Sequence, residues 1–300
     1  MTRDEQWLLR EKYGGKKTPE FEADVERLRR SEPLGYVIGW QPFLGLKIYL
    51  DSPCSAKATQ GTRSFIPRPE TEWWTDQLLK DARKCRFEDV SQRDGARHSK
   101  FSAENYACPR AGISARLSFL DLCAGSGAIG CAALAHIRTR RHDDASNVRV
   151  YFGEIEPAHK TTILKNIREN NLDESRADIR IGDLFSAGGG PASGGELFGD
   201  IKFDIIAVNP PYIPSGRVLP PSVADYEPAN ALYAGTDGLS FIRRIAAELS
   251  KHLAKNGVLW LECDSPTAET ARALFEEQGF NAEIRNDQYG VPRVVVVSFH

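Results

Sequence analysis

The sequence predicts an α/β fold in which helices cover both faces of a largely parallel, doubly wound sheet. From Leu117 to the C-terminus, short apolar segments alternate with amphipathic ones, which is typical of successive β-α-β units. A glycine-rich turn at 121–130 lies between the first of these strands and the first helix. Polar residues follow the next strands at their carboxyl ends, where ligands bind in folds of this kind.

The N-terminal part of the chain has a different pattern. Within residues 1–35, Phe21, Val25 and Leu28 recur at helical spacing with charged residues between them. This spacing predicts a short helical segment, which Pro33 ends.

A linker and the main domain follow. Residues 36–64 predict a β-hairpin, because apolar and turn residues alternate there, with the turn expected near Gly39–Pro42. The main domain is expected to span 65–300, and its first helix begins at Pro69, followed by acids that suit the positive end of a helix dipole. Stretches of low periodicity predict insertions in this domain near 85–116 and 186–200.

Seven segments of the main domain predict strands, and the amphipathic segments between them predict helices. The strand segments are 117–122, 147–155, 177–185, 202–209, 258–264, 282–287 and 293–300.

Composition argues against several classes of function. The formal net charge is −2, so the chain lacks the global basic field that drives binding to duplex nucleic acid. No apolar run approaches the roughly 20 residues that span a bilayer. A zinc site is a minor alternative whose spacing matches no ligand pattern; it would use Cys54, Cys85, Cys108 and His98.

The glycine turn and two acids predict a nucleotide cofactor other than NAD. The turn "DLCAGSGAIG" lets the backbone approach a ligand and leaves the N–H groups of a helix N-terminus free. Glu154 ends the second strand, where an acid can accept both hydroxyls of a ribose. Asp183 ends the third, where it can accept from an adenine amino group. Each feature alone is also compatible with an ordinary turn or a solvated strand end.

The fourth strand ends in "NPPY", Asn209 to Tyr212. Proline continues neither a sheet ladder nor a helix, so Pro210 and Pro211 stiffen the backbone as it leaves the sheet. The stiff turn would aim the Asn209 side-chain oxygen and nearby carbonyls into the ligand crevice, where they can grip both hydrogens of a planar –NH₂ group. Tyr212 can pack on the flat face of that group. Such a clamp aligns the lone pair of a poor nitrogen nucleophile with an electrophile.

Further motifs accompany this one: "PLGYVIGWQPFLGL" (33–46), "FIPRPETE" (65–72), "GDLF" (182–185), "YEPANALYAGTDGLSFIRRI" (226–245) and "YGVPRVV" (289–295). With them the chain resembles class I S-adenosylmethionine-dependent methyltransferases, specifically the release-factor glutamine N5-methyltransferases of the HemK/PrmC family. The resemblance covers about Pro33 to the C-terminus, apart from the insertions.

The resemblance implies a Rossmann-like, seven-stranded methyltransferase sheet, mostly parallel with its last strand antiparallel. It implies that S-adenosylmethionine is bound by Arg68, Pro69, Glu70, Thr71, Asp121, Cys123, Ala124, Gly125, Ser126, Gly127, Glu154, Ile155, Asp183, Leu184 and Asn209. The substrate carboxamide would be held by Asn209, Pro210, Pro211 and Tyr212, with Asn209, Pro210 and Tyr212 as the catalytic set.

The implied activity is direct, in-line methyl transfer to the glutamine of the Gly-Gly-Gln motif of a peptide-chain release factor. Because the amide proton can leave after transfer, no strong base is required, and we expect the six histidines to be solvated or structural. The expected protein is a monomer with no metal, no membrane contact and no stable nucleic-acid binding. By resemblance to organellar members it would reside in the mitochondrial matrix, with the cytoplasm as the alternative.

Three departures from the family pattern stand out. Cys123 replaces the usual glycine and Glu154 the usual aspartate. The helical segment at 1–35 is shorter than the family's docking bundle, so release-factor docking would be reduced or differently built.

Three other interpretations remain open at this point. A nucleic-acid base methyltransferase would use the same clamp on an adenine or guanine amine. An NAD-dependent dehydrogenase would share the glycine turn but leave "NPPY" without a role. A non-catalytic binding protein with this fold would explain the change at Cys123.

Overall fold

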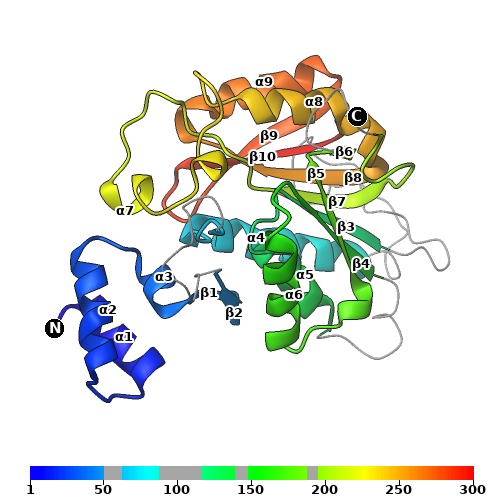
Figure 1. The fold of residues 1–300 in the computed structure, drawn as a ribbon. Coiled ribbons are helices and arrows are strands. Elements are labelled where there is room, and N and C mark those ends of the chain that lie inside the picture. Colours follow the sequence, from blue (N-terminus) through cyan, green and yellow to red (C-terminus); the bar gives the residue numbers. More distant parts are fainter. Residues whose placement is uncertain (51–62, 88–116, 139–147, 188–194) are drawn as a thin grey trace.

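The computed structural model describes residues 1–50, 63–87, 117–138, 148–187 and 195–300. The predicted insertions near 85–116 and 186–200, and the hairpin linker 36–64, lie partly outside these described residues. Figure 1 shows three N-terminal helices beside a larger body built on a central sheet.

The N-terminal helices are α1 (Arg3–Tyr13), α2 (Pro19–Arg29) and α3 (Leu34–Ile38). Thr2 and Thr18 cap the first two by accepting hydrogen bonds from backbone N–H groups. The three helices share a small core formed by Leu8, Phe21, Val25, Val37 and Ile38.

The hairpin forms, but its turn lies further along the chain than the predicted position near Gly39–Pro42. Residues 34–38 are helical, and Gly39 ends that helix in the left-handed conformation, at φ 96°. The hairpin consists of β1 (Trp40–Phe43) and β2 (Leu46–Tyr49), and its turn is Leu44-Gly45, at φ 47° and 80°. Positive φ at both central residues is the type I′ geometry that matches strand twist.

Two asparagines attach this hairpin to the main body. Asn170 accepts from Lys47 N–H at 3.0 Å and donates to Lys47 C=O at 2.8 Å. Asn166 does the same for Tyr49, at 2.7 and 3.0 Å. These side-chain amides pair with the backbone as a neighbouring strand would, so the edge of β2 is covered.

The central sheet has the strand order β6-β5-β4-β3-β7-β8-β10-β9. From β5 to β8 the strands are parallel, and β10 runs antiparallel to both β8 and β9. The predicted α/β class with an antiparallel last strand is therefore confirmed, and the two-residue β6 extends the seven predicted strands at one edge. The bounds are β3 (Leu117–Leu122), β4 (Val148–Glu154), β5 (Ala177–Asp183), β6 (Ser186–Ala187), β7 (Phe203–Val208), β8 (Leu253–Glu262), β9 (Phe280–Asn286) and β10 (Pro292–Phe299).

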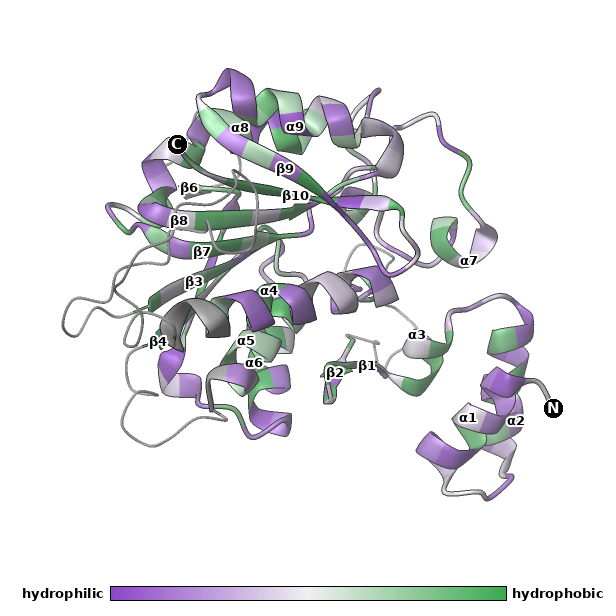
Figure 2. Cartoon of the chain, turned by 180° about the vertical axis from the view of Figure 1, so that it is seen from behind, coloured by the Kyte–Doolittle hydropathy of each residue, from purple (hydrophilic) through white to green (hydrophobic). Residues whose placement is uncertain are grey.

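Helices cover both faces of the sheet, and alternate strand residues point to the two sides. Phe119 packs with α4 (Pro69–Phe87), α5 (Ala128–Arg138) and α6 (His159–Glu169), whereas its neighbour Leu120 packs with α8 (Ser240–His252) and α9 (Ala268–Glu277). The short α7 (Pro221–Ala224) lies in the connection between β7 and α8. Figure 2 shows the hydrophobic strands enclosed between helices whose outer surfaces are polar.

In the described ranges no helix is both long and apolar enough to cross a bilayer.

Polar residues lie at the carboxyl ends of the parallel strands, along one edge of the sheet. Glu154, Asp183 and Glu262 are the last residues of β4, β5 and β8, and Asn209 directly follows β7. Because parallel strands share their carboxyl edge, these side chains converge on the region where ligands bind in such folds.

Candidate functional site

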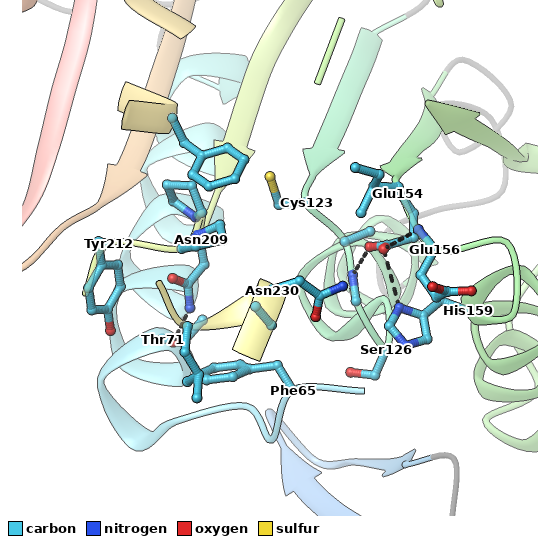
Figure 3. Close-up of a pocket in the computed structure, with 18 of the residues that line it drawn as sticks. Phe65, Thr71, Cys123, Ser126, Glu154, Glu156, His159, Asn209, Tyr212 and Asn230 are labelled. Carbon is cyan, nitrogen blue, oxygen red and sulfur yellow. Dashed lines mark hydrogen bonds and ion pairs between the residues drawn. The ribbon is translucent and has the colours of Figure 1, made fainter. Parts of the chain in front are cut away.

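A cavity of about 330 Å³ lies at the carboxyl edge of the sheet. Its walls come from the β3–α5 turn, the ends of β4, β5 and β7, the segment 65–71 and the segment 219–232. Figure 3 shows Asn209 and Thr71 on one side of this cavity and Glu154 and His159 on the other.

Most of the residues predicted to form the site line this cavity. They are Arg68, Thr71, Cys123, Ala124, Gly125, Ser126, Glu154, Ile155, Asp183, Leu184, Asn209, Pro210, Pro211 and Tyr212. Pro69, Glu70, Asp121 and Gly127 are not among the lining residues. Asp121 is buried behind the turn, where it accepts from Gly130 N–H at 2.8 Å, and burial raises the pKa of its carboxyl well above the usual value.

The glycine turn brings backbone close to the cavity. A Cβ at Gly130 would lie 2.2 Å from the Phe152 ring, so α5 approaches β4 this closely only with glycine there. Gly125 and Gly127 have φ of 55° and 77°. Cys123 has the same left-handed backbone, at φ 60°, although it carries a side chain.

Glu154 is a buried, ionised acceptor. Gly125 N–H donates to its Oε2 at 2.6 Å, Glu156 N–H donates to Oε1 at 2.9 Å, and His159 Nδ1 lies 3.2 Å from Oε1. Burial raises the pKa of Glu154, but His159 and the two N–H groups outweigh burial, so the pKa lies below its usual value. Because a carboxylate offers about four acceptor positions, acceptor capacity remains for a ligand hydroxyl.

Asp183 forms an ion pair with an arginine of α8. Arg244 Nη2, on α8, lies 3.0 Å from Asp183 Oδ2. The next residue, Leu184, has a left-handed backbone at φ 55° and places an apolar side chain on the cavity wall. The Asp183 carboxylate can accept a hydrogen bond from an amino group, and the Leu184 side chain can contact a flat ring.

The corner at 209–212 is braced by hydrogen bonds. Asn209 Nδ2 donates to Thr71 Oγ1 at 3.1 Å, and Tyr212 Oη donates to Glu262 Oε1 at 3.0 Å. Burial, with the nearby Glu262 carboxylate, raises the pKa of Tyr212 well above its usual value, so its hydroxyl is neutral. Behind the corner, Ile213 pairs with the segment after α7 through N–H and C=O bonds to Leu232 and Ala234.

Sequence reasoning missed several residues of this site. His159, which was expected to be solvated or structural, lines the cavity beside Glu154, with Nδ1 3.2 Å from Oε1. Phe65 and Asn230 also line the cavity, and Glu262 lies behind it. Glu262 ends a strand as Glu154 and Asp183 do, and this position was the signal that could have found it.

The zinc alternative has no support in the described part of the chain. Cys54, His98 and Cys108 lie outside the described residues, as does the side chain of Cys85. Among the residues that are described, no group of three or more His, Cys, Asp or Glu side chains could hold a metal ion.

Known proteins resemble this chain over most of its length. No protein-family model matches it. A relative from Thermodesulfovibrio yellowstonii is 28% identical over 276 residues, covering 91% of this chain and 78% of that protein. One from Mycolicibacterium smegmatis is 30% identical over 280 residues, covering 93% and 79%. One from Chlamydia trachomatis serovar L2 is 32% identical over 257 residues, covering 85% and 68%. All three carry the name release factor glutamine methyltransferase. The resemblance inferred from the motifs is thereby confirmed, and the chain belongs to the release factor glutamine methyltransferase family.

Proposed function

We propose that this protein transfers a methyl group from S-adenosylmethionine to a glutamine side-chain nitrogen in the Gly-Gly-Gln motif of a peptide-chain release factor. The observation that carries the proposal is that Glu154 and the asparagine-led corner at 209–212 line one cavity. A hydroxyl-accepting carboxylate and an amide-binding corner in the same cavity suit a nucleotide cofactor and a carboxamide substrate.

The cavity residues fit the cofactor. Glu154 keeps acceptor capacity for ribose hydroxyls, and Asp183 can accept from an amino group. Ile155, Leu184 and Phe241 provide apolar walls for a flat base. When bound, S-adenosylmethionine supplies a methyl group made electrophilic by a positively charged sulfur.

The corner residues fit the substrate. Asn209 Oδ1 is an acceptor for one amide N–H of the glutamine, and backbone carbonyls of the corner are acceptors for the other. Holding both N–H groups orients the nitrogen lone pair and stabilises the positive charge that develops on it. The Tyr212 hydroxyl is neutral and bonded to Glu262, so it is not a general base. This agrees with a proton that leaves only after transfer.

The test uses methyl-labelled cofactor and a recombinant release factor, either wild type or with the Gly-Gly-Gln glutamine changed to alanine. We expect label on the wild-type factor alone. Asn209→Ala should lower the transfer rate by on the order of 10²- to 10³-fold, the effect of removing one group that stabilises transition-state charge. Its cofactor affinity, measured by calorimetry, should fall much less than the transfer rate.

Equal labelling of both release factors would refute the substrate. Transfer to single-stranded DNA or RNA without transfer to the release factor would favour the base-methylating interpretation. A fully active Asn209→Ala variant would exclude the corner from the reaction.

A further inference from the structure

Glu262 forms a buried hub behind the corner. It is 1% exposed at the end of β8, and its Oε2 lies 2.7 Å from both Thr71 Oγ1 and Trp74 Nε1. Its Oε1 accepts from the Tyr212 hydroxyl. Glu262 lines no part of the cavity, so it acts on a ligand only through these neighbours.

The proton positions around this hub follow from the chemistry of its donors. When Glu262 is ionised, its carboxylate oxygens can only accept, and Oε2 accepts from the indole N–H of Trp74, which can only donate. Thr71 Oγ1 faces the same Oε2 atom, so the single Thr71 hydroxyl proton is donated to it. Thr71 Oγ1 is then left with lone pairs only, and it must accept.

This ordering fixes the side-chain amide of Asn209. At 3.1 Å from a Thr71 oxygen that can only accept, Asn209 must present Nδ2. Its Oδ1 therefore points away from Thr71, and no hydrogen bond from the described residues reaches this oxygen. If the Thr71 proton were free, it could donate to Oδ1, and the amide could turn over and present N–H groups to the substrate amide.

We propose that Glu262 is a positioning residue for methyl transfer: through Thr71 it determines that the oxygen of Asn209, and not its nitrogen, meets the substrate –NH₂ group. This inference rests on the proposed function. The corner at 209–212 could exist with either orientation of the Asn209 side-chain amide. The inference adds which orientation is present when the substrate binds.

The first test compares Glu262→Gln with Glu262→Leu. The Trp74 N–H forces a glutamine at this position to place its oxygen where Oε2 lies, so Glu262→Gln retains the acceptor for Thr71. Glu262→Leu has a similar volume and removes it. We expect kcat of the leucine variant to fall on the order of 10²-fold, because the reacting amide is misoriented. The glutamine variant should recover most of that loss. KM for the release factor and the calorimetric Kd for cofactor should stay within about threefold in both, since neither variant alters a lining residue.

A second pair of variants decides the question if Glu262→Leu does not fold, as judged by circular dichroism and thermal unfolding. Thr71→Val removes the hydroxyl and Thr71→Ser keeps it, so the serine variant should have the higher kcat by at least tenfold. The double variant Glu262→Leu, Thr71→Val should be no slower than the slower single variant, because both interrupt one relay.

Three results would overturn the proposal: equal losses in Glu262→Gln and Glu262→Leu, equal kcat for Thr71→Val and Thr71→Ser, or losses that multiply in the double variant. These are distinct from failure of the proposed function, in which the wild-type protein would not label the release factor at all.

Discussion

Two residues of the cavity wall have a backbone conformation that their side chains disfavour. Cys123 and Leu184 have φ of 60° and 55°, and they directly follow β3 and β5. An L-residue in this region costs on the order of 1 kcal/mol or more, so such positions persist where the surrounding structure enforces them. Burial and nearby carboxylates also raise the pKa of the Cys123 thiol, which is therefore a neutral group on the cavity wall.

A pair of variants tests the strain at Cys123. In Cys123→Gly, the relieved strain and the extra flexibility of the unfolded chain offset each other, so we expect stability to change by less than about 1 kcal/mol. In Cys123→Val, a β-branched side chain at positive φ should cost about 2 kcal/mol. Urea denaturation measures both, and a valine variant as stable as wild type would show that the turn relaxes freely.

At the scale of elements, the segment between α7 and α8 supports the "NPPY" corner. Ile213 pairs in parallel with Tyr233, and Ser215 N–H donates to Gly235 C=O. Gly238 has φ of 78°, and a Cβ there would lie 2.4 Å from the Tyr212 carbonyl oxygen. This close approach explains why a glycine stands in the segment Asp237-Gly238-Leu239.

Gly238→Ala and Gly235→Ala form a matched pair, because both glycines have φ of 78° and only the first meets a backbone oxygen. We expect Gly235→Ala to cost about 1 kcal/mol from φ alone. Gly238→Ala should cost about 3 kcal/mol, since the corner must also shift. Transfer activity should fall further in Gly238→Ala than in Gly235→Ala, measured at equal folded fraction. Equal losses of stability would mean that the close approach between Gly238 and Tyr212 adds nothing to the loss in the free energy of unfolding.

At the scale of the whole molecule, stability also depends on buried groups that are not part of the cavity lining. His252, at the end of α8, is 1% exposed and stacks on Phe185 with ring centroids 4.1 Å apart. Burial lowers its pKa to about 4. The unfolded chain binds this proton near pH 6.5 and the folded chain only near pH 4, so its contribution is lost as pH falls through that window.

His252→Phe keeps the stacked ring and removes the proton site. Between pH 7 and pH 4.5 the wild-type free energy of unfolding should fall by about 2 kcal/mol more than that of His252→Phe. Denaturation at the two pH values measures the difference, and the exposed His300 replaced by Phe is the control. The same pH dependence in all three proteins would mean that His252 is protonated readily in the fold.

The fold class and much of the candidate site could be predicted from the sequence because both follow from local patterns. Strand and helix periodicity gives the parallel sheet, and its carboxyl edge collects residues such as Glu154, Asp183 and Asn209. The short helix α3 was mistaken for part of a strand because five residues are too few to show a helical period.

Pairings between distant elements could not be predicted in this way. The ion pair between Arg244 and Asp183 and the hydrogen bonds that Glu262 accepts depend on side-chain placement in three dimensions. No local spacing encodes such contacts.

The hub at Glu262 has a consequence for synthesis of the protein. Two of its donors, Thr71 and Trp74, precede it by 191 and 188 positions, and Tyr212 precedes it by 50. Because the ribosome synthesises the chain from its N-terminus, the "NPPY" corner emerges before Glu262. Until Glu262 is in place, the Asn209 amide of the growing chain is free to rotate. Competence for transfer should arise only after β8 has emerged and joined the sheet, so that an enzyme proposed to act on translation termination becomes active close to the end of its own translation.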